Sequence, residues 1–390
     1  MSRADPLPRL RFSLATATTF RAELQAETKS YLDGAGRHRF ADWRVGAKVI
    51  ALAMVSGCLY VLALQAHGFG GFVLPYLGFH FVAMLLGMNA LHDAAHGALM
   101  QSPAHNRWLM RCISIPIGID PAYWAIRHVH FHHSYANIDG YDLDTDPNPF
   151  LRQTPYQRWL PHFRYQHWYW PLVAALSLPY LCWYSDWADH FGKTRLAARI
   201  GPRNWSGFGL TKTAHLCVGL LLPLWVLRHV GIGWGEVLGC YLLGQMLASS
   251  VLVAMILGTH WAEVEFFEPA AVGVMPHTWH EHAFRTACDW TPRPRWLGFW
   301  LGGLNWHLTH HLLPTFSHRH YQALAPIIAR LAQRHGLDYR RLSYPALVKS
   351  QQTFLRAMGA GDFSVQARIS AGPASAGDSA NARRGSDRSS

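Results

Sequence analysis

The chain has 390 residues, half of them hydrophobic and only 15% charged. Soluble proteins carry roughly 25% charged residues, so this composition argues against a soluble protein and for a membrane protein. The formal net charge is +12, but the basic residues are spread along the polar segments, which argues against nucleic-acid binding. The six Cys are scattered and form no CxxC motif, which argues against a disulfide framework.

Residues 1–45 are polar and rich in Arg. They contain no short apolar stretch followed by a small-residue cleavage site, so we expect no cleaved signal peptide. Because basic loops are retained on the cytosolic side of a membrane, we expect a cytosolic N-terminal segment over 1–45.

Four long apolar runs follow, and each is close to the ~20 residues that a helix needs to cross the hydrocarbon. The first pair covers 46–65, interrupted only by Lys48, and 70–91. The second pair covers 213–231 and 236–258. The short link inside each pair predicts two transmembrane hairpins.

A fifth stretch, 169–185, is apolar but contains Pro171 and Pro179 and is edged by Trp residues. These features predict a helix that lies in the membrane interface. The tail 366–390 is rich in Ser, Ala, Gly and Arg, which predicts disorder. The membrane domain is therefore expected to occupy 46–365.

The 25 His are the compositional anomaly. Many gather in three short groups with the sequences HDAAH, HVHFHH and HLTHH, and a further His ends the fourth apolar run. The nine residues that we expect to bind metal are His92, His96, His128, His132, His133, His260, His307, His310 and His311.

Helical geometry gives the spacing of these residues a chemical meaning, because residues four apart lie ~40° apart around a helix and residues three apart about 60°. His92 and His96 therefore share a face. His307, His310 and His311 fall within an arc of roughly 100° and are expected to converge on one region.

The middle group is more crowded. On an α-helix His128 and His132 share a face, and His133 lies about 100° further round. His130 would point roughly 200° away from His128. We therefore exclude His130 from the metal ligands.

The number of imidazoles indicates how many metals they hold. A tetrahedral zinc takes four ligands, or three and a water, so nine imidazoles suit two metals with four or five nitrogen ligands each. Neutral imidazole binds Zn, Cu, Fe and Ni alike, so ligand chemistry alone does not select the metal. With 1–45 cytosolic, two hairpins return His92 and His260 to the same side, whereas a full crossing by 169–185 would separate His92 from His307.

Other histidines are interpreted as isolated residues. His80 lies about 18 Å along a helix from His92, so we expect it to face a partner helix or a substrate passage. His280 and Glu281 begin like the zinc-protease motif HExxH, but Phe284 stands where the second His is required. The lone histidines predicted to lie on the surface are His162, His167, His318 and His320.

HDAAHG, HVHFHHSYAN and NWHLTHHLLP resemble, in this order, the three histidine boxes of the membrane fatty acid desaturase superfamily, which also contains lipid hydroxylases and carotenoid ketolases. The resemblance covers roughly residues 46–325. It implies an all-α integral membrane fold, with four transmembrane helices in two hairpins and a cytosolic helical cap that holds a di-iron site. By resemblance, the first box supplies His92 and His96, the second His128, His132 and His133, and the third His307, His310 and His311, while His260 matches the extra histidine after the fourth span.

The resemblance also implies the chemistry. Two Fe ions would use O2 to oxidise an unactivated C–H bond of an acyl or other lipid substrate. The chain has no HPGG motif of a fused cytochrome b5, so we expect a separate electron-transfer protein of the ferredoxin or cytochrome b5 type. Arg outnumbers Lys, as in GC-rich bacteria, and we expect a multi-pass protein of the bacterial inner membrane with a cytosolic active site.

The main hypothesis is a desaturase of acyl-lipids or acyl-CoA. A hydroxylase or ketolase of a carotenoid, sterol or other lipid is the alternative, because a shift of about 1 Å in substrate position could decide between hydrogen removal and oxygen insertion. A desaturase of a small metabolite and a non-enzymatic haem or metal carrier are further alternatives. The polar residues considered for orienting the imidazoles are Asp93, Asp139, Asp142, Asp144, Asp146, Glu263 and Asn305.

Overall fold

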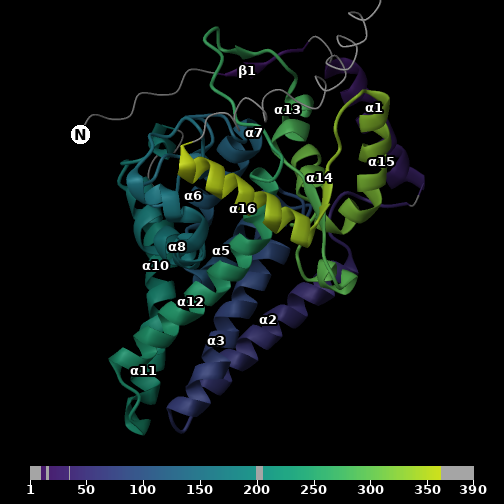
Figure 1. The fold of residues 1–390 in the computed structure, drawn as a ribbon. Coiled ribbons are helices and arrows are strands. Elements are labelled where there is room, and N and C mark those ends of the chain that lie inside the picture. The colour runs from purple at the N-terminus through teal and green to yellow at the C-terminus, as the bar shows by residue number, and fades with distance from the viewer. Residues whose placement is uncertain (1–9, 15–16, 35, 199–204, 362–390) are drawn as a thin grey trace, which may run out of the picture.

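The computed structural model describes residues 10–14, 17–34, 36–198 and 205–361. The predicted disordered tail therefore lies outside the described residues. The regular secondary structure of the described chain is almost entirely helical (Figure 1). Its α-helices are α1 (Ala17–Gly34), α2 (Trp43–Leu64), α3 (Phe69–Leu86), α4 (His92–Ala95), α5 (Pro103–Ile117), α6 (Pro121–Ala125), α7 (His133–Tyr135), α8 (Gln166–Tyr180), α9 (Asp186–His190), α10 (Trp205–Leu216), α11 (Leu222–Leu227), α12 (Trp234–Ile256), α13 (Trp279–Thr286), α14 (His307–Leu312), α15 (Tyr321–Arg334) and α16 (Tyr344–Ala360).

Short irregular elements connect these helices. The strands are two or three residues long and pair in parallel, β1 (Arg11–Phe12) with β2 (Val274–Met275) and β3 (Asp289–Thr291) with β4 (Arg341–Ser343). The π-helical turns, which have i→i+5 hydrogen bonds, are Gly87–Leu91, Ile126–His132, Leu181–Ser185 and Cys217–Leu221. One of these turns, Gly87–Leu91, directly precedes a histidine box, and another, Ile126–His132, contains most of one.

Four helical segments of the described chain are long and apolar enough to cross a membrane, which confirms the predicted number. They are Trp43–Leu64, Phe69–Ala95, Trp205–Val230 and Trp234–His260. The third begins at Trp205, whereas we expected a start at 213. Thr211 and Lys212 interrupt the hydropathy there, but they do not interrupt the helix.

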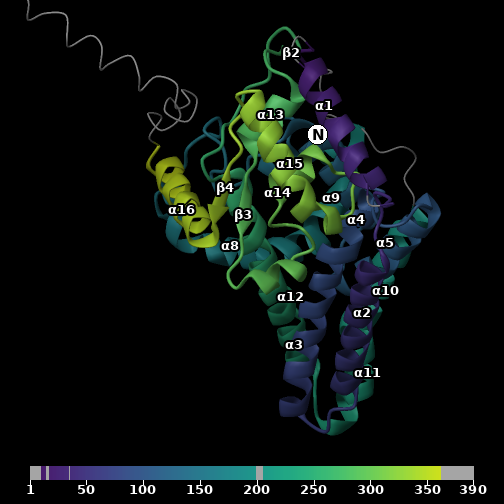
Figure 2. The same cartoon turned by 90° about the vertical axis from the view of Figure 1, so that its right-hand side faces the viewer.

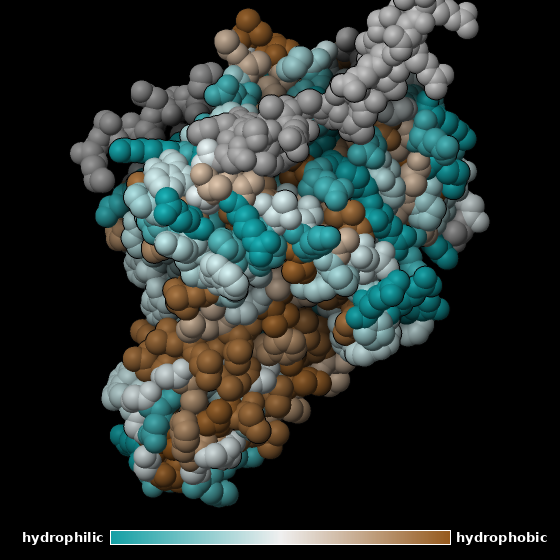
Figure 3. Space-filling model, viewed as in Figure 1, coloured by the Kyte–Doolittle hydropathy of each residue, from teal (hydrophilic) through white to brown (hydrophobic). Residues whose placement is uncertain are grey.

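The spans form an elongated stem below a broad cap (Figures 1 and 2). Helix α3 packs against both α2 and α12, and on the face seen in Figure 3 hydrophobic residues cover much of the stem beneath a mostly hydrophilic cap. In the cap, α14 contacts α13 and α15, and α1 contacts the same two helices. The apolar spans therefore end at the floor of a polar cap.

One apolar core joins the stem to the cap. It contains Leu52 and Met84 from the first hairpin together with Trp290, Leu304 and Leu347 from the cap. All five side chains are buried. Burial of apolar area is the main favourable contribution to folding, so this continuous core holds the cap in place on the ends of the spans.

Helix α8 covers most of the stretch predicted to be interfacial, and it is not among the four candidate spans of the described chain. One face packs against α12, where the Ser249 hydroxyl donates to the Ala174 oxygen at 2.5 Å and accepts from the Leu178 amide at 3.0 Å. The opposite face exposes Trp168 and Leu172. This arrangement suits a helix with lipid on its outer face, and its position in the interface remains a prediction.

Candidate metal centre

The histidine boxes lie where spans end and the cap begins. Box one follows the π-helical turn Gly87–Leu91 at the end of the second span, and His260 ends the fourth. Box two lies in the π-helical turn Ile126–His132 and the start of α7, and box three forms α14. Segments separated by up to about 200 residues in the sequence thus meet at one level of the molecule.

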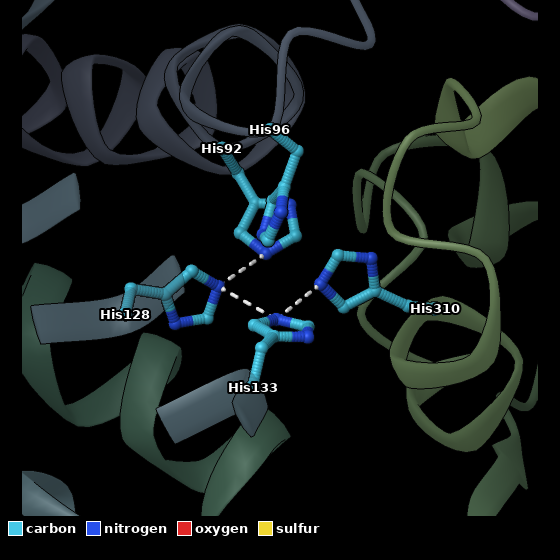
Figure 4. A group of neighbouring side chains, drawn as sticks. All are labelled: His92, His96, His128, His133 and His310. Atoms are coloured by element: carbon cyan, nitrogen blue, oxygen red, sulfur yellow. Dashed lines mark hydrogen bonds between the residues drawn. The ribbon is translucent and has the colours of Figure 1, made fainter. Parts of the chain in front are cut away.

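Five imidazoles form the first histidine group, in which the possible ligand atoms all lie within 4.8 Å of one another. Figure 4 shows the five rings directed toward a common centre. The Nε2 atom of His128 lies 3.1 Å from that of His92 and 3.2 Å from that of His133, which in turn lies 2.9 Å from Nε2 of His310. The members of the first group are His92, His96, His128, His133 and His310.

Four imidazoles form the second histidine group, with their ligand atoms again within 4.8 Å of one another. Nε2 of His307 lies 2.6 Å from Nε2 of His260 and 3.3 Å from Nε2 of His311. The His132 ring lies 4.6 Å from that of His260 between centroids. The members of the second group are His132, His260, His307 and His311.

The two groups are in direct contact. The rings of His133 and His311, one from each group, stack with centroids 4.2 Å apart and planes inclined by 21°. Boxes two and three each contribute to both groups. All nine predicted residues therefore lie in one cluster divided into five and four, and their binding of metal remains a prediction.

Box two contributes to both groups. His128 and His132 lie side by side as expected, with stacked rings whose centroids are 5.6 Å apart, and with Asp144 they form a further candidate metal group. Within the two histidine groups, however, His128 joins His133 and not His132. The π-helical turn Ile126–His132, in which the His133 N–H donates to the His128 oxygen, makes residues five apart neighbours as well. His130 is exposed and belongs to neither group.

The three histidines of box three also divide between the two groups, although their positions within an arc of roughly 100° around the helix predicted that they would converge on one region. His310 joins the first group, while His307 and His311 join the second. The expectation that all three converge on one region holds only for the cluster as a whole. Helix α14 lies between the groups because its two sides face different segments, box one and His260.

Hydrogen bonds at Nδ1 orient several of the rings. His310 Nδ1 lies 2.8 Å from the Tyr321 hydroxyl, which donates its own hydrogen to the Phe316 oxygen at 2.9 Å, so the ring must be the donor. His260 Nδ1 donates to the Thr286 oxygen at 2.8 Å. A hydrogen fixed on Nδ1 leaves the Nε2 lone pair free to face the group, as is typical of histidine ligands.

His132 is oriented by carboxylates. Its Nδ1 lies 3.2 and 3.3 Å from the two oxygens of Asp142 and 3.5 Å from Asp144. Burial works to lower the pKa of His132, but Asp142 outweighs it and raises that pKa to about 9. Asp142 itself accepts the backbone N–H groups of Asn137 and Asp144, at 2.9 and 3.0 Å, so the acceptor is fixed in place.

The other polar residues considered for this role differ in their contacts. Asp93 Oδ1 lies 4.0 Å from His92 Nδ1, and Asp146 pairs with Arg195 at 3.4 Å. Within the described ranges, no contact with a ligand imidazole is found for Asp139, Glu263 or Asn305.

Sequence reasoning missed the residues that hold box three. Asp289 is fully buried and accepts the Thr309 amide at 3.1 Å, the Thr309 hydroxyl at 2.6 Å and the Tyr339 hydroxyl at 2.7 Å. Nothing in the local sequence around Asp289 or Tyr321 signals these roles, because their partners lie on other elements. A buried carboxylate beneath α14 and a tyrosine behind His310 position this box.

The prediction that His318 and His320 are surface residues was wrong. His318 is 9% exposed and His320 1% exposed. His320 lies within hydrogen-bond distance of the Tyr31 hydroxyl and the His38 oxygen, at 3.1 and 3.0 Å. The N-terminal segment folds over this turn, and a contact between residues so far apart leaves no local signal.

The chemistry of most of the nine side chains fits metal ions, whereas His132, whose pKa is raised, must lose a proton to bind one. Burial, together with the neighbouring imidazoles, holds the pKa of His128, His133 and His310 well below its usual value, so these rings are neutral as metal ligands must be. His96 Nε2 is buried in the first group without a hydrogen-bond partner. With metal–imidazole bonds of ~2.1 Å, neighbouring nitrogens on one ion lie about 3 Å apart, close to the 2.6–3.3 Å observed.

Comparison with known proteins places this geometry in a family. The family model named Fatty acid desaturase matches residues 71–343. The chain belongs to the fatty acid desaturase family. The membership of the fatty acid desaturase family that the three histidine boxes predicted is thus confirmed.

Individual relatives within the fatty acid desaturase family agree. The chain is 30% identical over 291 residues to an sn-1 linoleoyl-lipid 6-desaturase of Synechocystis sp.. The matched region covers 70% of this chain and 76% of the relative. It is 26% identical to a protein of the same name from Arthrospira platensis, over 67% of this chain and 70% of the relative. It is 29% identical to a probable Delta(5) fatty acid desaturase C of Dictyostelium discoideum, over 70% of this chain and 61% of the relative.

The loop before box three supports box one by a close approach that only glycine permits. Gly302 has a φ of +57°, and a Cβ there would overlap the Met88 carbonyl oxygen in the π-helical turn preceding His92. Gly302→Ala is expected to lower the free energy of unfolding by more than about 1 kcal/mol, measured as a lower thermal midpoint in detergent. Gly298→Ala in the same loop is the control, because its Cβ would meet only Pro292 at 3.5 Å; an equal shift in both variants would contradict the close approach.

Proposed function

We propose that this desaturase inserts a double bond into an acyl chain of a membrane lipid, using O2 and two Fe ions held by the first and second histidine groups. The observation that carries this proposal is the division of nine buried or partly buried imidazoles into touching groups of five and four at the ends of apolar spans. Iron bound there would supply the oxidising power for an unactivated C–H bond. In the overall reaction two neighbouring methylenes lose one hydrogen each, and O2 takes up these two hydrogens, two electrons from an external donor and two protons from solvent and leaves as two waters.

The protein contributes position and exclusion of water. Six of the nine imidazoles are buried and the other three are partly buried, and the Asp142 and Tyr321 side chains behind them are buried as well. The hydrophobic surface of the stem ends where the cap begins (Figure 3), and the histidine boxes lie at that boundary. An acyl chain from the surrounding bilayer therefore reaches the groups without crossing the polar surface of the cap.

The names of the relatives support a finer proposal about the substrate. Two are named for action on linoleoyl chains at the sn-1 position of a lipid and at carbon 6, and a third is named a Delta(5) desaturase. We infer that this chain acts on an acyl group esterified in a glycerolipid, at a position near its carboxyl end. Such a position lies close to the headgroup, which agrees with histidine groups at the end of the stem rather than in its middle.

Orientation and electron supply are also proposed. We propose that the cap lies on the cytosolic side of the bacterial inner membrane, and its many basic residues support the cytosolic side under the positive-inside rule. The electrons would come from a separate carrier of the ferredoxin or cytochrome b5 type. Such a carrier would dock on the cap, the polar part of the molecule next to both groups (Figures 1 and 3).

Lipid analysis after expression in a bacterial host fed with linoleate tests the proposal. The expected product is an acyl chain 2 Da lighter than the substrate, with the new double bond near the carboxyl end. A 16 Da gain would instead identify a hydroxylase. Expression of His310→Ala to the same level is the control, and unchanged lipids from both proteins, with a reducing partner supplied, would contradict the proposal.

A further inference from the structure

A buried chain of polar side chains connects the first span to box one. Lys48 lies within α2 and is only 5% exposed. Its Nζ donates to the Phe299 oxygen at 2.8 Å and to Nε2 of His318 at 3.0 Å. Nδ1 of His318 lies 2.9 Å from Oδ2 of Asp93, the residue that follows the ligand His92.

The hydrogen bonds give this chain one direction. Because His318 accepts from Lys48 at Nε2, its ring hydrogen lies on Nδ1 and is donated to Asp93. The same carboxylate oxygen also accepts the His318 amide at 3.0 Å and the Ser317 hydroxyl at 2.9 Å. The ammonium of Lys48, the neutral imidazole of His318 and the carboxylate of Asp93 are thus hydrogen-bonded in this order. The positive charge of Lys48 balances the negative charge of Asp93, whose side chain is 1% exposed.

The other carboxylate oxygen faces the metal centre. Asp93 Oδ1 lies 4.0 Å from His92 Nδ1, and both atoms are buried without a hydrogen-bond partner. His92 directs its Nε2 into the first histidine group. A metal-bound histidine usually donates its second N–H to a carboxylate or carbonyl, and Asp93 would be that acceptor once the 4.0 Å separation shortens to hydrogen-bond distance.

We propose that Lys48 and His318 are positioning residues, which hold Asp93 against His92 and so strengthen metal binding by the first histidine group. This inference rests on the proposed function, because it assumes that the first group holds a metal. Ionisable side chains within membrane spans are costly and are retained for a purpose. Removing one partner of a buried charge pair leaves the other uncompensated, so loss of Lys48 disturbs Asp93 and, through it, His92.

The test is a Co2+ titration of purified, monodisperse full-length protein in detergent, followed by the visible absorption of the bound ion. Wild type is expected to bind two ions per chain. Lys48→Met and His318→Leu are expected to bind one of them 10–100-fold more weakly, the range typical of residues behind metal ligands. Lys48→Arg keeps the charge and its donors and is expected to retain tight binding of both ions.

The matched control is Lys212→Met. Lys212 is also 5% exposed within a span and is ion-paired, at 2.6 Å, to Asp186, but none of the contacts described for it involves either histidine group. Unchanged affinity in both Lys48→Met and His318→Leu overturns the inference, as does an equal loss in Lys212→Met. A wild-type protein that binds fewer than two ions contradicts the proposed di-iron site instead, so the two failures are distinguishable.

Discussion

Replacement of His310 by Ala is expected to lower turnover by more than about 100-fold, beyond the 10–100-fold typical of residues that only support a ligand. His310 Nε2 lies among the nitrogens of the first histidine group, 2.9 Å from that of His133. His96→Ala, in the same group, and His132→Ala, in the second, are expected to behave alike. Each variant should retain about one iron per chain instead of two, measured by elemental analysis alongside lipid product formation.

His130→Ala is the matched control for these three variants. It removes the same side chain from box two, but His130 is exposed and lies in neither group. We expect its turnover and iron content to match those of wild type. Full activity in all three ligand variants, or an equal loss in His130→Ala, would refute the assignment of ligands.

Asp142→Asn is expected to weaken metal binding and turnover by 10–100-fold, because a carboxylate behind a ligand imidazole fixes its tautomer and strengthens it as a donor. Both Asp142 oxygens face Nδ1 of His132, and each also accepts a backbone N–H. An amide of the same size offers only one acceptor oxygen and no charge. Iron retained after dialysis against a chelator, compared with wild type, measures the effect.

Asp139→Asn provides the control for Asp142→Asn. It makes the same chemical change three residues earlier, and Asp139 has no described contact with a ligand ring. Its iron retention should equal that of wild type. If the two variants lost iron equally, the effect would belong to the charge of the loop and not to the carboxylate behind His132.

The sequence by itself was sufficient for the family, the four spans and the nine histidines that come together. Each of these rests on local properties. About 20 apolar residues in a row are long enough to span the hydrocarbon whatever their neighbours, and the i, i+4 spacing of His92 and His96 places them together on one helix. The position of the histidine boxes on one side of the membrane followed from the two predicted hairpins, because each hairpin returns the chain to the side from which it started.

Only the tertiary structure decided how the histidines divide and what supports them. The π-helical turn Ile126–His132 pairs His128 with His133, because its backbone hydrogen bonds join residues five apart in the sequence. The hydropathy pattern of the sequence does not distinguish such a turn from an ordinary α-helix. Tyr321, Asp289 and His318 act through partners on other elements, and Lys48 reaches its partner across 270 positions. Spacing within one segment cannot report such contacts, since they exist only once the cap has folded onto the spans.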